Sequence, residues 1–308
     1  MDEASYAPPP QQETNPMSAS PTGEAGASQT AKGCSCGCGT GNCTCGAKAA
    51  SNLPATSAYV YALGRIEPRF PSLSIEKEFA QATGRAETID LTDHEALQAV
   101  LSDKQNRYLV RQLCWVLNVD GAATYLVLPR EEPDLDLLIG TLRPRPRPTD
   151  VDVIVGVRGP ARACNELVLP TVIVDQLYSF DLDTLVRSIQ SANDATATNI
   201  EAAAESLFMR VLRLAGNAGE IDEHRALNYL AIRYPAIYTM TAEAHNRNLS
   251  FLGFKARCSS RDSVRKIAEV IFSYRNRQTD IIEKFFVRVD VTDEFPFLVT
   301  KLSPFYEM

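Results

Sequence analysis

Hydrophobic and polar positions change their period several times along the chain, and each change predicts a new element. Alternation over residues 59–63 predicts a short strand that ends in a turn at Gly64. Apolar residues three and four apart then predict two helices, one beginning at Ser74 and one at the capping pair Thr92 and Glu95. The N-terminal part of the folded region therefore begins as a strand followed by helices.

A period of two returns in the middle of the chain. One predicted strand carries alternating apolar residues, namely Leu113, Trp115, Leu117 and Val119. Gly121 turns the chain, residues 124–128 return it, and β-branched runs at 151–157 and 167–174 predict further strands. We expect a mainly antiparallel sheet with helices packed on one side.

The C-terminal part returns to helical spacing before it ends in strands. Residues 183–216 have helical spacing, and a further helix over 222–233 stops before Pro235. Residues 264–272 fit both periods, but the turn residues at 276–279 and the strict alternation over 281–291 favour a β-hairpin. The predicted fold class is α+β: an antiparallel sheet with packed helices over residues 56–180, then helices and a C-terminal β-hairpin over 181–308.

Composition separates a tail from this folded region. Residues 1–55 are rich in Pro, Gly, Ser, Ala, Thr and Gln, which predicts a disordered segment. There is no run of 18 apolar residues and no secretory signal, so we expect a cytoplasmic protein without a membrane contact. The net charge of −7 argues against nucleic-acid binding, and the basic stretch at 143–147 is interpreted as a proline-stiffened loop.

Three long sequence segments resemble one known family. They are YVYALGRIEPRFPSLSIEKEFAQATGR at 59–85, RALNYLAIRYPAIY at 225–238 and VIFSYRNRQTDIIEKFFVRVDVTDEFPFLVTKLSPFYEM at 270–308. The chain resembles, over about residues 56–308, the C-terminal domain of unknown function shared by the PatA and PatG proteins of cyanobactin maturation. That family acts on ribosomally made peptides that are heterocyclised, cleaved and macrocyclised. The resemblance therefore implies a pathway rather than a reaction.

The resemblance also limits the chemistry that we expect. Proteolysis and cyclisation belong in the large family members to a subtilisin-like domain that has no counterpart in this sequence, and no Gly-Thr-Ser nucleophile signature occurs. We expect a non-catalytic accessory or peptide-handling protein whose partners are the peptide-modifying (RiPP) enzymes or the precursor peptide. An enzyme built on the family domain is the alternative, and the oligomeric state is open. Weak peptide-binding candidates surround the start of the first helix, with a solvated helix face as the alternative interpretation: Glu76, Lys77, Glu78 and Arg85.

The tail concentrates the reactive side chains of the sequence. Five of the eight cysteines lie within twelve residues: Cys34, Cys36, Cys38, Cys43 and Cys45. Thiolates at this spacing can gather Zn or Cu, which predicts a cytosolic metal-binding protein as the alternative function. The Gly-Cys and Gly-Thr pairs equally resemble a core peptide destined for thiazoline and oxazoline formation. Disulfide or redox chemistry and the absence of a specific role complete the interpretations that the sequence leaves open.

The remaining candidates are isolated residues. The scattered cysteines Cys114, Cys164 and Cys258 are interpreted as ordinary small buried residues. His224 lies beside two acids at a helix start, where a base or a surface cap residue would both fit. No nucleophile–base pair can be nominated, so no catalytic residue is assigned.

Overall fold

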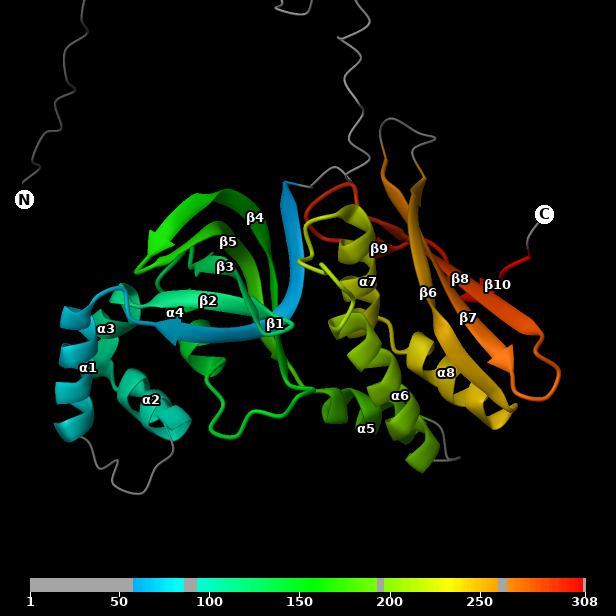
Figure 1. Ribbon diagram of the computed structural model, residues 1–308, viewed down its shortest axis with the longest axis horizontal. Coiled ribbons are helices and arrows are strands. Elements are labelled where there is room, and N and C mark those ends of the chain that lie inside the picture. Colours follow the sequence, from blue (N-terminus) through cyan, green and yellow to red (C-terminus); the bar gives the residue numbers. More distant parts are fainter. Residues whose placement is uncertain (1–57, 86–92, 193–196, 260–264, 307–308) are drawn as a thin grey trace, which may run out of the picture. The chain divides into compact units, whose positions relative to one another are not determined.

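The computed structural model describes residues 58–85, 93–192, 197–259 and 265–306, and the chain divides into a unit up to Asn52 and a body from Leu53 to Met308. The predicted α+β class is confirmed: helices and strands alternate through the body (Figure 1). The predicted tail lies outside the described residues. None of the described helices is long and apolar enough to cross a membrane.

Five strands in the first half close into a barrel in the order β1-β2-β3-β5-β4. Their bounds are β1 (Tyr59–Arg69), β2 (Cys114–Val119), β3 (Ala122–Leu128), β4 (Val151–Cys164) and β5 (Leu167–Phe180). Every pair is antiparallel except β3 with β5, and the helix α4 (Asp134–Gly140) lies between β3 and β4 in the chain. This topology is that of the OB fold, a five-stranded Greek-key barrel.

Closure of the barrel refines the expected antiparallel sheet, and it corrects the expectation that the first strand ends in a turn at Gly64. β1 continues through Gly64 to Arg69, pairing with β4 as far as Gly64 and with β2 from Arg65 onward (Figure 1). A Cβ at Gly64 would lie 2.3 Å from the carbonyl oxygen of Asn118, so only glycine lets the strands approach this closely. The glycine marks a change of partner rather than a turn.

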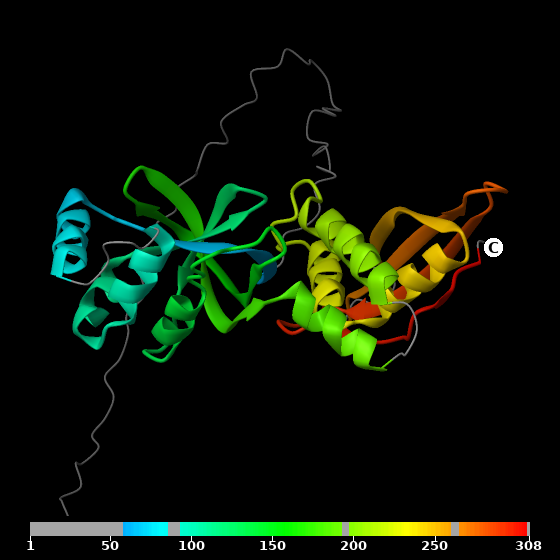
Figure 2. The same cartoon turned by 90° about the horizontal axis from the view of Figure 1, so that it is seen from below.

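Helices of the β1–β2 connection close one end of the barrel (Figure 2). They are α1 (Leu73–Arg85), α2 (Asp93–Ser102), the short 3₁₀-helix Lys104–Asn106 and α3 (Arg107–Gln112). Val100, Leu101 and Leu109 join the barrel residues Trp115 and Leu117 in one apolar core, as burial of the apolar helix face requires. Ala82 of α1 belongs to the same core, so α1 also packs on this end of the barrel.

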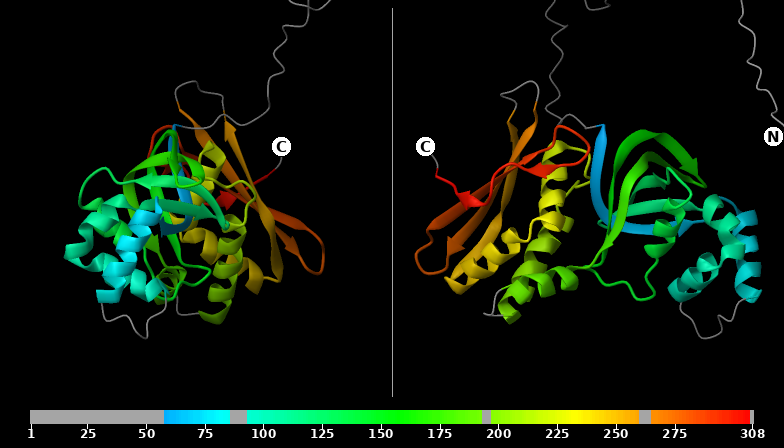
Figure 3. Two further views of the ribbon diagram at one scale, coloured as in Figure 1. Left: turned by 60° about the vertical axis from the view of Figure 1, so that its left-hand side comes forward. Right: turned by 180° about the vertical axis from the view of Figure 1, so that it is seen from behind.

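Helices in the second half cover one face of an antiparallel sheet (Figure 3). The helices are α5 (Leu182–Ala192), α6 (Ala197–Leu212), α7 (Asp222–Arg233) and α8 (Ala236–Asn246). The sheet has the order β10-β8-β7-β6, with β9 also pairing with β8. Its strands are β6 (Leu249–Ser259), β7 (Ile267–Asn276), β8 (Ile282–Asp290), β9 (Phe297–Leu298) and β10 (Ser303–Pro304). The predicted C-terminal hairpin is confirmed as β7–β8.

Hydrogen bonds join the barrel to α7 and the turn before it. The amide of Tyr61 donates to the carbonyl of Gly219 at 2.9 Å, and the side-chain amide of Asn228 donates to the carbonyl of Tyr61 at 2.8 Å. Asn228 is fully buried and also exchanges hydrogen bonds with Asn217. Barrel residues such as Leu63 belong to the same apolar core as the second sheet, so the two halves pack as one body.

A pair of carboxyl groups also lies between the halves. Glu294 follows β8, and Asp175 of β5 lies beside it, held by an ion pair of 2.6 Å with Arg130. Burial, and then the hydrogen bond and charge of Asp175, raise the pKa of Glu294 to about 7. One carboxyl of the pair is therefore protonated in mildly acidic solution.

Replacing Glu294 with Gln should flatten the pH dependence of stability. A carboxyl group whose pKa is raised on folding stabilises the protein fully below its unfolded pKa, and this stability is lost as the pH rises through the folded pKa. We expect the wild type to lose about 1 kcal/mol relative to Glu294→Gln between pH 5 and pH 8, after allowance for partial exposure. Thermal unfolding at both pH values measures it, with the exposed Asp293→Asn as control; equal pH profiles for wild type and Glu294→Gln would contradict the assignment.

Candidate peptide-binding groove

An open groove of about 640 Å³ lies between the start of α1 and the tip of the β4–β5 hairpin. One wall is the end of β1 with the first turn of α1, and the other is the hairpin tip, residues 164–167. Its lining residues are Pro68, Arg69, Phe70, Ser72, Leu73, Glu76, Cys164, Asn165, Glu166 and Leu167. The two walls are about ninety residues apart in the sequence, and only the folded barrel brings them together.

The α1 wall is fixed by aromatic packing. The ring of Phe70 lies 5.3 Å from that of Phe79 on α1, centre to centre, and both rings pack on the barrel core. The amides of Ile75 and Glu76 donate to the carbonyl of Ser72, so α1 begins at Leu73 and contains Ser74, which was expected to cap it. Leu73 is left 62% exposed at the groove, with no partner that covers it among the described residues.

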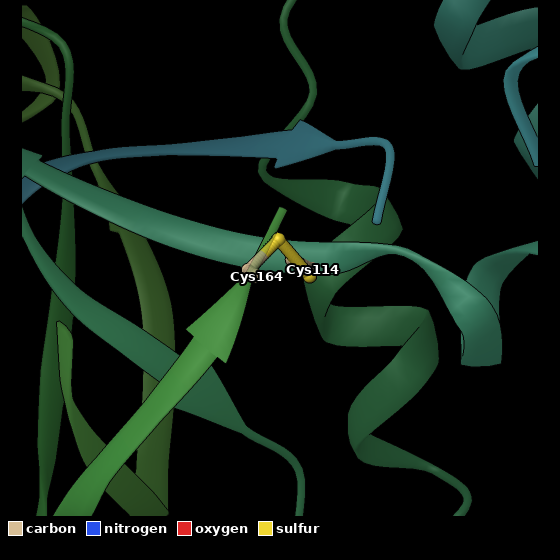
Figure 4. The surroundings of a disulfide bond; sticks show 2 residues. All are labelled: Cys114 and Cys164. Atoms are coloured by element: carbon tan, nitrogen blue, oxygen red, sulfur yellow. A yellow bond between two sulfur atoms is a disulfide. The ribbon is translucent and has the colours of Figure 1, made fainter. Parts of the chain in front are cut away.

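The hairpin wall is fixed by a disulfide. Cys164, the last residue of β4, is bonded to Cys114, the first residue of β2, and their Cα atoms are 6.3 Å apart (Figure 4). Cys164 also packs with Val116 and Leu126 on the outer surface of the barrel. The hairpin tip is therefore folded back over β2 and β3 and held there. Asn165, at a φ of 53°, makes the tight turn, which asparagine tolerates better than most residues.

This disulfide corrects the expectation that the scattered cysteines are ordinary buried thiols. Cys114 and Cys164 are 50 residues apart, and only the barrel's strand order places the end of β4 against the start of β2. Cys258 is a free thiol, as expected, but it is half-buried rather than buried. Burial, with the nearby charges of Glu223 and Asp222, raises the pKa of its thiol to about 12, so it stays protonated.

The groove has the chemistry of a binding surface. In OB folds the β2–β3 face and the β1–β2 and β4–β5 loops are the parts that bind ligands. Here the β4–β5 hairpin covers that face, and the same two loops line the groove. Leu73 supplies apolar surface, Glu76 and Glu166 supply carboxylates, and Arg69 supplies a half-exposed cation. Neither a histidine nor a free cysteine is among its described lining residues.

Comparison with known proteins now identifies the family. The family model described as PatG Domain matches residues 59–266, which include the whole barrel, the helices α5 to α8 and the strand β6 of the second half. The chain belongs to the PatG domain family. A solved structure titled "PatG Domain of Unknown Function" has a TM-score of 0.63 with this chain at 19% sequence identity, covering 81% of this chain and 99% of that one. No curated protein matches the sequence.

The helix-start candidates have different positions in this PatG-family fold. Glu76 lines the groove, whereas Lys77 is exposed beside it and does not line it. The Glu78 carboxylate accepts a hydrogen bond of 2.6 Å from the hydroxyl of Tyr108, and Arg85 is the last residue of α1. The structure therefore brings one of the four candidates, Glu76, to the groove.

The other groove residues were not found from the sequence. Asn165 between two β-branched runs was a signal for a hairpin turn, and it would have placed Glu166 at the tip. The partner of that tip was not readable, because it depends on barrel closure. The predicted modification or metal ligands of the tail lie outside the described residues: Cys34, Cys36, Cys38, Cys43 and Cys45.

His94 and His224 do not line the groove. His94 is exposed at the edge of a separate cavity of about 180 Å³, which Arg143 and Asp152 also line. The buried Asp152 carboxylate pairs with Arg143 at 3.1 Å and accepts a hydrogen bond of 2.9 Å from the amide of Ile66. It therefore stabilises β1 at the point where the strand changes its partner from β4 to β2. His224 is half-buried, and burial lowers the pKa of its imidazole.

Proposed function

We propose that this PatG-family chain is a non-catalytic accessory module that holds an extended peptide in the groove during cyanobactin-type modification of ribosomal peptides. The observation that carries the proposal is the groove itself, with exposed Leu73 on one wall and Glu166 at the tip of the other. The pathway rests on family membership. The partners would be a precursor peptide and the enzymes that modify it.

The groove can bind a peptide because it combines apolar surface with hydrogen-bond acceptors. The groove volume lies in the range of ligand sites, and covering Leu73 would remove apolar surface from water. The carboxylates of Glu76 and Glu166 can accept hydrogen bonds from backbone amides of an extended chain, which has no internal partners for them. The disulfide keeps the hairpin wall in place, so the wall loses little conformational entropy when a peptide binds.

The tail supplies a natural candidate for the peptide. Residues 33–46 carry five cysteines, a serine and two threonines among glycines, which suits an unfolded substrate of ring-forming enzymes. In this proposal the tail is a core peptide, or the remnant of one, that the groove presents. Its alternative role as a Zn or Cu ligand would involve the same cysteines and would not need the groove.

Substitution of Leu73 by Asp should weaken peptide binding at least tenfold. The probe is a fluorescent synthetic peptide of residues 33–46 with S-methylated cysteines, which is mixed with increasing amounts of the body, residues 53–308, and followed by anisotropy. We expect a measurable Kd for the wild type and at least a tenfold higher Kd for Leu73→Asp, because an apolar anchor is lost and a charge is introduced.

The matched control is Lys77→Asp, which also introduces an aspartate on exposed α1 but lies off the groove. Its Kd should stay within about twofold of the wild type. No binding to the wild-type chain, or equal losses in both variants, would refute the groove as the peptide site. The body is used without the tail, because a tail that binds in cis would weaken together with the probe and hide the difference between the variants.

A further inference from the structure

A second pocket, of about 310 Å³, lies in the C-terminal half between α6, α8 and the start of β6. Residues of α6 and α8 line its sides, and Leu249 and Phe251 of β6 line its base together with Ala203. No residue of the groove contributes to it. It is therefore a separate site, independent of the function proposed for the groove.

Two arginines and a histidine from three elements line this pocket. Arg210 comes from the last turn of α6, His245 from the last turn of α8, and Arg277 from the turn after β7. None of the described residues that line it is an aspartate or glutamate. The pocket therefore presents positive charge that its own lining does not neutralise, which favours an anion.

Arg210 is held in position by two contacts. Its Nη1 donates to the carbonyl of Leu252 at 2.8 Å, and its guanidinium lies 5.0 Å from the centre of the Phe251 ring. A guanidinium carries five N–H donors, so this hydrogen bond leaves others available to a ligand. Arg210 is thus preorganised without being neutralised.

Arg277 is held through its backbone rather than its side chain. Its amide donates to the carbonyl of Asn248 at 3.1 Å, which fixes the turn beside the pocket. Its exposed guanidinium makes no ion pair with the described residues. The carboxylate of Glu283 is engaged by Arg247 at 3.1 Å instead. Arg277 can therefore turn toward an anion in the pocket.

The remaining lining residues supply an apolar surface for a ligand. Ala203 and Leu249 provide apolar surface, and the small side chains Ala202 and Ser206 on α6 leave the space that a larger residue would fill. The hydroxyl of Thr241 is already engaged by the carbonyl of Ile237 and by Tyr274. The pocket thus combines a cationic rim with an apolar base.

We propose that this pocket binds an organic carboxylate whose apolar group fills the base while the carboxylate is held by Arg210 and Arg277. Two sources supply this chemistry: the C-terminal α-carboxylate of a peptide with an apolar last residue, and a free small carboxylic acid. Planar guanidinium groups match a carboxylate with paired hydrogen bonds, and the apolar base gives no advantage to an inorganic anion.

The test measures binding of four probes to the full-length chain by calorimetry. They are N-acetyl-Gly-Ala-Phe as the acid, the same peptide as its C-terminal amide, 3-phenylpropionate and inorganic phosphate. We expect the acid to bind at least tenfold more tightly than the amide and more tightly than phosphate. A tighter Kd for the peptide acid than for 3-phenylpropionate assigns the peptide terminus, and equal or reversed values assign the free acid.

Arg277→Gln should raise the Kd of the carboxylate probe at least tenfold, because it removes the charge without disturbing the sheet. The control is Arg247→Gln, an exposed arginine nearby that does not line the pocket. The proposal is overturned by equal binding of acid and amide, by tightest binding of phosphate, or by no effect of Arg277→Gln. Leu73→Asp should leave the binding of the carboxylate probe unchanged. Failure of the pocket proposal can therefore be distinguished from failure of the groove proposal.

Discussion

Replacing Arg225 with Met is expected to lower the free energy of unfolding by about 3 kcal/mol or more. The side chain is completely buried and donates to the carbonyls of Val291 at 2.8 Å and Glu294 at 3.1 Å. It also pairs with Asp222 at 3.2 Å and lies over the ring of Tyr59. Met would leave these carbonyls buried without a donor, so the loop after β8 would lose its attachment to α7.

Urea unfolding of the purified variants measures this loss. Arg225→Lys keeps the charge but cannot reach several carbonyls at once, so it should also destabilise the protein. The matched control is Arg233→Met on the same helix, where the exposed arginine lies 4.9 Å from the ring of Tyr178. That change should cost no more than about 1 kcal/mol. A loss below about 1 kcal/mol for Arg225→Met would show that the loop is held by other contacts.

Reduction of the Cys114–Cys164 disulfide is expected to destabilise the body by about 3 to 4 kcal/mol. The bond closes a loop of 50 residues, and the cost of opening it follows mainly from the added freedom of the unfolded chain. Reduction also frees the hairpin tip from the outer surface of β2. We therefore expect weaker peptide binding in the groove as well as a lower Tm.

The double variant Cys114→Ala, Cys164→Ala provides the control. A phosphine reductant should lower the Tm of the wild type toward that of the double variant and leave the double variant unchanged. This comparison removes any contribution from the tail cysteines, which both proteins share. A wild-type Tm that does not respond to the reductant would contradict a stabilising role for the bond.

Local patterns were enough to predict the elements that local interactions determine. The helix Asp222–Arg233 has the predicted bounds, because acidic residues favour its start and Pro235 prevents its continuation. The β7–β8 hairpin followed from strict alternation beside a turn at Asn276, whose side-chain oxygen accepts from the amides of Gln278 and Thr279. Both signals lie within a few residues of the element that they define.

Elements determined by distant contacts were missed or misread. β6 was not predicted, because a bulge between Phe251 and Gly253 shifts the phase of its alternation. α8 was not predicted either, since several of its positions are buried and no clear polar stripe marks a helix. Gly64 was read as a turn because its role, the close approach of β1 to Asn118, is visible only after barrel closure.

The two walls of the groove also differ in whether local sequence signals predict them. Glu76 was found because it lies on a recognisable helix start, and family phrases include that segment. The opposite wall depends on a disulfide between two strands and on a hairpin folded over a barrel, neither of which has a local signature. Sequence reasoning thus identified one wall of the groove, and the fold supplied the other.

Amide hydrogen exchange with and without the S-methylated peptide of residues 33–46 tests the central claim most directly. We predict that the peptide slows exchange in two separate segments, residues 68–76 and residues 164–167, which are the two walls of the groove. Protection confined to other segments, or no protection at saturating peptide, would contradict the groove as the peptide-binding site.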